Sequence, residues 1–188
     1  MRSVFLDRDG TINRDVHHLR CVEELELLAG ASAGIRMLNR AGLRVVVITN
    51  QAAVARGLLS EEKLAEIHQE LQALLAREGA FVDAIYYCPH HPTEGFGRYR
   101  QTCACRKPQP GALQRAANEL GLDLSQSYCV GDKGSDLEAG HALGCRTVLV
   151  RTGYGLTTEA QLGADSVQPD YIASNLLEAA GWILEHIQ

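Results

Sequence analysis

The sequence contains no apolar run close to the ~20 residues that span a bilayer, so a transmembrane helix is not expected. It also lacks an excess of positive charge. The net charge of −5 argues against nucleic acid or an anionic membrane as the main partner. One arginine and a short apolar run lead directly into an acidic motif, which does not resemble a secretory signal. We therefore expect a cytoplasmic, monomeric protein.

Internal repeats and low-complexity linkers are also missing. The composition, 46% hydrophobic and 22% charged, is typical of a globular protein, and 188 residues suffice for one domain with a substantial core. Apolar runs alternate with amphipathic segments, which predicts an α/β fold with a doubly wound parallel sheet. The expected strands are 3–6, 43–48, 84–88, 127–130 and 147–150, and the expected helices are 32–40, 60–77, 111–120, 137–143 and about 173–187.

An acidic motif follows the first predicted strand. In the segment Val4–Thr11, Asp7 and Asp9 stand one residue apart, and Gly10 permits a sharp turn after them. In an extended chain both side chains point the same way, and their repulsion favours a hard cation such as Mg²⁺ between them. The alternative is an Asp-rich turn without a ligand.

Polar residues also follow two other predicted strands. Thr49 and Asn50 follow the second strand, and the segment Gly131–Asp136 follows the fourth with Asp132 and Asp136. The carboxyl ends of parallel strands converge at one edge of a sheet, so these groups are expected to form one site with Asp7.

Four potential metal ligands lie between residues 88 and 105. Cys88, His90, Cys103 and Cys105 supply three thiols and one imidazole, a set that suits tetrahedral Zn²⁺. The intervening loop has no core of its own, so a metal would order it. Spacing alone leaves His91 as an alternative to His90, and unrelated free cysteines are the competing interpretation. Cys129 and Cys145 are expected to be small core residues.

The motifs together resemble the haloacid-dehalogenase-type (HAD) phosphatases. The resemblance rests on Asp7-x-Asp9-Gly10-Thr11, Thr49-Asn50, Lys107-Pro108 and Gly131-Asp132-x-x-x-Asp136, in that order. More narrowly, the chain resembles the heptose bisphosphate phosphatase family over nearly its whole length. The residues that carry this resemblance are Thr49-Asn50-Gln51, Ala55-Arg56-Gly57, Tyr86–Pro92, Cys105–Pro108, Gly131-Asp132-Lys133 and Val150–Gly153. This resemblance implies a capless, single-domain phosphatase over residues 1–188, with the zinc loop 88–105 inserted before Lys107.

The resemblance also implies a reaction. Asp7 would be the nucleophile that forms an aspartyl-phosphate, and Asp9 the general acid and base. Catalytic Mg²⁺ would be held by Asp7, the Asp9 backbone carbonyl and Asp132, with Asp136 behind them, whereas Zn²⁺ would be structural. Thr49 and Lys107 would contact the phosphoryl group. The substrate would be a sugar bisphosphate, namely heptose 1,7-bisphosphate losing its 7-phosphate, in nucleotide-heptose synthesis for lipopolysaccharide core or related glycans.

Substrate specificity would come from loops around the open site. Arg106, with its planar fork, suits a second phosphate or a sugar hydroxyl, and a surface ion pair is the alternative. The chain departs from the family at Asp15–Leu19 and at Ala52-Ala53, both on the sugar-facing side. The expected substrate-binding residues are Asp15, His17, His18, Asn50, Gln51, Arg56, Arg106 and Lys133.

Three other functions compete with this one. A phosphatase of the same family acting on histidinol phosphate or another small molecule has nearly the same motifs. A zinc-stabilised binding module without activity would not need Asp7, Asp9, Lys107 and Asp132 together. A mutase of the same superfamily would normally carry a cap that retains its intermediate.

Overall fold

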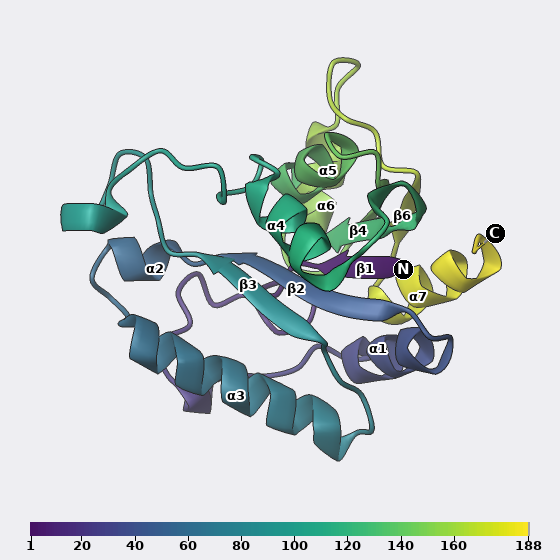
Figure 1. Ribbon diagram of the computed structural model, residues 1–188, viewed down its shortest axis with the longest axis horizontal. Helices are drawn as coiled ribbons and strands as arrows, with labels where there is room; N and C mark the ends of the chain where they lie inside the picture. Colours follow the sequence, from purple (N-terminus) through teal and green to yellow (C-terminus); the bar gives the residue numbers. More distant parts are fainter. Residues whose placement is uncertain (188) are drawn as a thin grey trace.

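A six-stranded parallel sheet forms the centre of the molecule (Figure 1). The computed structural model describes residues 1–187, so Gln188 of the expected domain lies outside the described residues. The sheet order is β3-β2-β1-β4-β5-β6, with β1 between the two halves. The strands are β1 (Ser3–Leu6), β2 (Arg44–Asn50), β3 (Ala84–Cys88), β4 (Tyr128–Gly131), β5 (Arg146–Val150) and β6 (Tyr171–Ala173).

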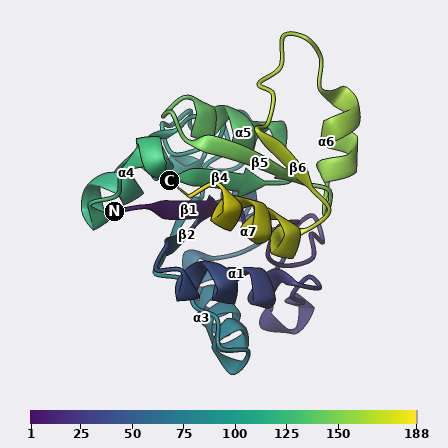
Figure 2. The same cartoon turned by 90° about the vertical axis from the view of Figure 1, so that its right-hand side faces the viewer.

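Helices cover both faces of this sheet, as Figures 1 and 2 show. The α-helices are α1 (Ala31–Arg40), α2 (Ala52–Ala55), α3 (Glu61–Arg77), α4 (Gly111–Leu120), α5 (Gly134–His141), α6 (Gly155–Gln161) and α7 (Leu176–Glu185). The short 3₁₀ segments are η1 (Val22–Glu24), η2 (Gly97–Tyr99) and η3 (Leu124–Gln126). The α/β class and the doubly wound parallel sheet are therefore confirmed.

Two separate cores follow from the alternation of side chains along the strands. In β1, Val4 and Leu6 pack with α1, α3 and α7, whereas Phe5 packs on the other face with α4 and α5. All three side chains are fully buried, so β1 is covered on both faces. The end of β1, which Asp7 follows, is thus held by packing on both faces of the sheet.

Several predicted boundaries were wrong, each for a local reason. β2 continues to Asn50 because Thr49 and Asn50 still pair with β3. α5 begins at Gly134, three residues early, because the Asp136 carboxylate accepts from the Lys133 backbone N–H at 3.0 Å and caps the helix. The last helix begins only at Leu176, with Asn175 as its N-cap.

Among the α-helices and strands, α2, α6 and β6 were not predicted, and neither were the three short 3₁₀ segments. β6 has three residues and pairs with β5 at the edge of the sheet, too short to show a period. Within residues 1–187, no helix is long and apolar enough to cross a membrane.

Candidate active site and zinc loop

Three neighbouring strands carry polar groups to one edge of the sheet. Asp7 follows β1, Thr49 ends β2, and Asp132 follows β4, and these strands are adjacent in the order β2-β1-β4. The expected convergence of the motifs is therefore confirmed. The chain leaves β1 toward β2 and later returns to β4 on the other side, and the crevice at such a switch point is a common ligand site.

Three buried carboxylates and one lysine form the centre of this edge. Asp7, Asp132 and Asp136 each place an oxygen within 4.8 Å of the others. Lys107 Nζ lies 2.8 Å from Asp7 Oδ1 and 2.6 Å from Asp136 Oδ1, and it donates to the Ile48 carbonyl at 2.6 Å. Lys107 is therefore fixed between two carboxylates with its charge directed at the nucleophile candidate.

The ionisation of the carboxylates reflects their burial. Burial raises the pKa of Asp7 to about 6, although Lys107 opposes it, and burial raises the pKa of Asp132 to about 8, with a further increase from Asp7. For Lys107, Asp136 and Asp7 outweigh burial and raise the pKa above its usual range. Burial therefore disfavours the ionised carboxylates at this edge of the sheet, and a bound cation would stabilise them.

The surroundings of Asp132 fit a divalent cation. Its Oδ1 is buried and accepts no hydrogen bond from any residue among 1–187, and the nearest ammonium, that of Lys133, lies 3.8 Å away. A Cβ at Gly10 or at Gly153 would come within 2.2 Å of Asp132 Oδ2, so only glycine lets the carboxylate enter this position. Clustered carboxylate oxygens are the ligands that Mg²⁺ prefers.

Asp9 does not belong to this cluster. β1 ends at Leu6 and the chain turns at Gly10, whose φ is +88°, so the period-two argument that aligned Asp7 with Asp9 was wrong. The Asp9 carboxylate instead accepts hydrogen bonds from Arg8, Asn13 and Gln51. Burial alone would raise the pKa of Asp9, but the Arg8 guanidinium and the two amides lower it.

Asn50 and Gln51 support the neighbouring groups through their side chains. Asn50 Nδ2 donates to the Lys107 carbonyl at 3.0 Å, and its Oδ1 accepts from the Lys107 N–H at 3.1 Å. Gln51 Nε2 donates to Asp9 Oδ2 at 2.9 Å and to Thr49 Oγ1 at 2.8 Å. Their side chains thus hold Lys107 and Asp9 in place.

The loop after the first motif lies beside Lys133. Asp15 Oδ2 is 3.1 Å from Lys133 Nζ, and that ammonium lies 4.8 Å from the centre of the Tyr154 ring. His17 has a left-handed backbone with φ of 66°, and its Nδ1 is 2.9 Å from the Tyr154 hydroxyl. Three expected substrate-binding residues are therefore together, and Tyr154 is a neighbour that the sequence did not indicate.

The remaining expected residues lie toward the zinc loop. Arg56 contacts His18 Nε2 at 2.6 Å and Glu94 at 2.7 Å. Arg106 donates to the His90 carbonyl at 3.1 Å, and it lines a cavity of about 190 Å³ with Lys107, Pro108 and other residues between 92 and 109.

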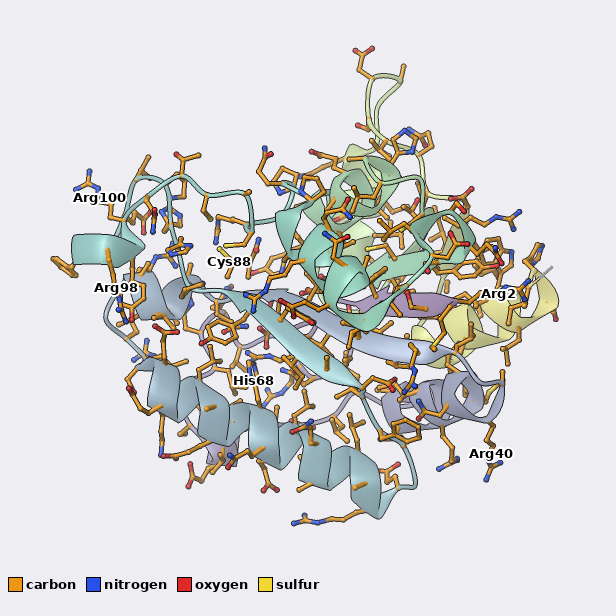
Figure 3. All side chains as sticks on the ribbon, viewed as in Figure 1. Arg2, Arg40, His68, Cys88, Arg98 and Arg100 are labelled. Carbon is orange, nitrogen blue, oxygen red and sulfur yellow. The ribbon has the colours of Figure 1, made fainter. Side chains whose placement is uncertain are left out.

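The four predicted zinc ligands converge at the end of β3, where Figure 3 labels Cys88. Cys103 Sγ lies 3.4 Å from Cys88 Sγ and 3.3 Å from Cys105 Sγ, and His90 Nδ1 is 3.5 Å from Cys105 Sγ. His91 instead accepts from the Glu94 backbone N–H at 2.9 Å. All four ligand atoms lie within 4.8 Å of one another, which fits a tetrahedral ion bound by thiolates and imidazole.

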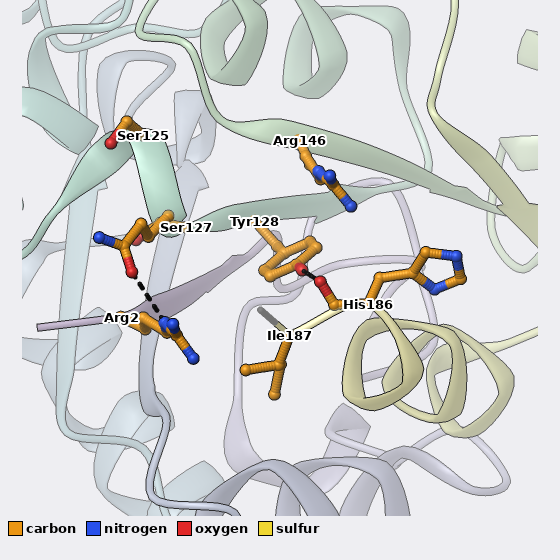
Figure 4. A pocket seen from close by; sticks show the side chains of 8 residues that line it. Arg2, Ser125, Ser127, Tyr128, Arg146, His186 and Ile187 are labelled. Atoms are coloured by element: carbon orange, nitrogen blue, oxygen red, sulfur yellow. Dashed lines mark hydrogen bonds between the residues drawn. The ribbon is translucent and has the colours of Figure 1, made fainter.

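A second cavity lies at the opposite end of the strands (Figure 4). Its volume is about 180 Å³. Tyr128 lines it, and the Tyr128 hydroxyl donates to the His186 carbonyl at 2.9 Å, which connects the wall of the cavity to the C-terminal segment. It contains none of the motif residues. The other lining residues are Arg2, Ser125, Gln126, Ser127, Arg146 and Ile187.

Three residues around Asp9 were not indicated by the sequence. Arg8, Asn13 and His68 are all buried. Arg8 lies between Asp7 and Asp9 in the first motif, and its residue type alone does not indicate a contact with Asp9. His68 lies sixty positions away on a helix whose apolar period it does not disturb.

Comparison with known proteins agrees with this geometry. Residues 104–179 match the HAD-hydrolase-like family. The chain is 41% identical over 166 residues to a D-glycero-beta-D-manno-heptose-1,7-bisphosphate 7-phosphatase of Yersinia pestis, covering 88% of each chain. The protein of that name from Escherichia coli K12 is 42% identical over 166 residues, 88% of this chain and 87% of the relative.

Solved structures give the same result. The crystal structure of D,D-heptose 1,7-bisphosphate phosphatase from B. bronchiseptica, complexed with magnesium and phosphate, superposes with a TM-score of 0.87 at 37% identity, over 98% of this chain and 99% of that one. A putative HAD-like phosphatase from Mesorhizobium loti has a TM-score of 0.84 at 35% identity, over 100% and 86% of the two chains. The chain therefore belongs to the D,D-heptose 1,7-bisphosphate phosphatase family of HAD-like phosphatases.

Proposed function

We propose that the protein removes the 7-phosphate of D-glycero-D-manno-heptose 1,7-bisphosphate, as a cytoplasmic monomer in nucleotide-heptose synthesis for lipopolysaccharide core or related glycans. The observation that carries this proposal is the buried Asp7–Lys107 pair at the edge of the sheet, with Asp132 beside it. The similarity to heptose bisphosphate phosphatases over 88% of the chain supports the substrate.

Asp7 is the proposed nucleophile. One of its oxygens attacks phosphorus, the bond from phosphorus to the sugar oxygen breaks, and an aspartyl-phosphate forms. An anion attacking a phosphate dianion meets repulsion, so the site needs positive charge, which Lys107 supplies 2.8 Å from Asp7. Mg²⁺ held by Asp7, Asp132 and the Asp9 carbonyl would supply the rest of this charge. Asp136 supports the site by binding Lys107 and capping α5.

Asp9 is the proposed general acid and base. Its carboxyl gives a proton to the sugar oxygen as that bond to phosphorus breaks, and its carboxylate later takes a proton from the water that attacks the aspartyl-phosphate. The Thr49 hydroxyl and the Asn50 backbone N–H would donate to the phosphoryl oxygens. The contact of Gln51 with both Thr49 and Asp9 supports this arrangement, because it places the two groups beside one another.

The sugar and its second phosphate are proposed to lie outside this centre. The primary 7-phosphate stands on a chain carbon and can reach Asp7, whereas the 1-phosphate is attached to the ring. Arg106, Lys133 and Arg56 supply the positive charge proposed to surround the sugar, and Asp15, His17 and His18 belong to the loop beside Lys133 and Arg56. Their contacts within the protein are therefore expected to exchange for contacts with the substrate.

The order of phosphate release tests the substrate assignment. With heptose 1,7-bisphosphate, phosphorus NMR should show the C7 monoester signal disappearing into inorganic phosphate while the C1 signal persists. Histidinol phosphate and glycerol phosphate serve as comparison substrates and should turn over more slowly. Loss of the C1 signal first, or faster turnover of histidinol phosphate, would contradict the proposal.

The zinc loop 88–105 is proposed to be a structural insertion of the same catalytic domain. Elemental analysis of protein produced with zinc available should find about one Zn²⁺ per chain, and Cys103→Ser should lose it, because a thiolate ligand is removed. The mutated chain should also become more susceptible to proteolysis between residues 88 and 105. Cys21→Ser is the matched control, since Cys21 is outside the cluster, and it should keep its zinc. Full zinc content in Cys103→Ser would show that the ligand set is wrong.

A further inference from the structure

Arg8 is a buried arginine in the middle of the first motif. Its side chain has no accessible surface, although arginine is rarely buried without a partner. The guanidinium binds Asp9 through two nitrogens: Nη2 lies 2.9 Å from Oδ1 and 2.8 Å from Oδ2, and Nε lies 3.2 Å from Oδ1. A planar fork of this kind fixes the plane of a carboxylate, which a single point charge does not.

The other side of the guanidinium is held by α3. Arg8 Nη1 lies 3.1 Å from His68 Nε2, and His68 is 8% exposed. Burial, together with the nearby Arg8 charge, lowers the pKa of His68 to about 3, so the imidazole is neutral and its Nε2 accepts the hydrogen bond. Figure 3 shows His68 between α3 and the sheet, and its ring packs against that of Tyr87 at 5.8 Å.

Two amides complete the support of Asp9. Asn13 Nδ2 donates to Oδ1 at 2.9 Å, and Gln51 Nε2 donates to Oδ2 at 2.9 Å. Both amides belong to short segments next to the site: Asn13 lies in the loop after β1, and Gln51 directly follows β2. Arg8 alone connects Asp9 to a long helix of the opposite layer, through His68.

This arrangement matters because proton transfer depends on direction. A carboxyl group that serves a leaving oxygen and then a water must hold one oxygen toward the phosphorus with small error. We propose that Arg8, anchored by His68 of α3, is a positioning residue that orients the Asp9 carboxyl for both proton transfers. This inference rests on the role of Asp9 in the proposed function.

The dependence of the rate on the leaving group tests the role of Arg8. An alkyl phosphate such as the heptose substrate needs its leaving oxygen protonated, whereas p-nitrophenyl phosphate releases a stable phenolate without help. In Arg8→Met we expect kcat for the alkyl phosphate to fall by ~10²-fold, the usual contribution of general acid catalysis. With p-nitrophenyl phosphate, the same variant should give an initial burst of one nitrophenolate per enzyme, followed by slow turnover, because water activation also needs Asp9.

Two further variants separate orientation from charge and from folding. Arg8→Lys keeps the charge but not the fork, so it should show the same substrate dependence as Arg8→Met. His68→Leu leaves Arg8 in place without its anchor and should lower alkyl phosphate turnover by about tenfold, whereas His68→Gln retains an acceptor and should restore it. If Arg8→Met does not fold, His68→Leu provides the test instead.

The inference would be overturned if Arg8→Met lost the same fraction of turnover on both substrates and also gave a smaller burst. That result would mean only that fewer enzyme molecules are folded. Unchanged kinetics in both Arg8→Met and His68→Leu would overturn it as well. Asp9→Asn distinguishes this failure from that of the proposed function. If Asp9→Asn shows no dependence on the leaving group, the role of Asp9 is wrong; if it does and the Arg8 and His68 variants do not, only the positioning role is wrong.

Discussion

Replacing Asp7 with asparagine is expected to lower kcat by ~10⁴-fold or more, the order of loss that follows removal of a catalytic nucleophile in enzymes with covalent intermediates. Asparagine has the same shape, and its Oδ1 can still accept from Lys107, so the fold should survive. Because Asp7 is buried beside Asp132 and Asp136, removing its charge also relieves repulsion. Phosphate release from the bisphosphate measures the loss, and circular dichroism verifies the fold.

Asp165→Asn is the matched control for this change. Asp165 is exposed in the loop after α6, so its amide should leave both turnover and stability unchanged. Turnover by Asp7→Asn within tenfold of the unaltered enzyme would remove Asp7 from the mechanism and leave the cluster with a binding role only.

Replacing Lys107 with methionine is expected to have the second largest effect. Methionine fills a similar volume but removes the cation from between Asp7 and Asp136, leaving uncompensated buried carboxylates. Breaking a buried ion pair from one side typically costs about 3–5 kcal/mol of unfolding free energy. Loss of a fixed charge beside the reacting phosphoryl group should also lower kcat by ~10²–10³-fold. Urea denaturation and steady-state kinetics measure the two effects.

Lys63→Met is the matched control for Lys107→Met. Lys63 Nζ lies 2.6 Å from Glu66 Oε2, a similar contact distance, but its side chain is 44% exposed. Exposed pairs contribute little because water and salt screen them, so the unfolding free energy should change by less than about 1 kcal/mol. Equal effects of the two substitutions would mean that burial does not determine the importance of Lys107.

The sequence predicted the centre of the site because its signals are local. Asp7, Thr49 and Asp132 each follow an apolar run, and parallel strands bring such ends to one edge without further information. The zinc loop was equally readable, since its four ligands lie within eighteen residues and thiols with imidazole suit few other purposes.

The sequence did not predict the supports of the site, because they are contacts between distant segments. Arg8 and His68 meet across sixty positions, and a histidine on a helix has no feature that identifies a buried acceptor. The predicted orientation of the Asp9 side chain was wrong for a related reason. β1 ends at Leu6, so the two-residue period of the strand does not extend to Asp9. The short β6 and α6 were missed because neither has enough residues to show a period.

The most direct test of the account is to trap the phosphoryl group on the enzyme. During turnover, borohydride reduces an acyl phosphate to an alcohol and so converts the aspartate that carries the phosphoryl group into homoserine, which peptide mass spectrometry locates. Homoserine is expected at Asp7, and none is expected in enzyme treated without substrate. Homoserine at Asp9, Asp132 or Asp136, or substrate-dependent phosphate release with no reduced aspartate, would contradict it.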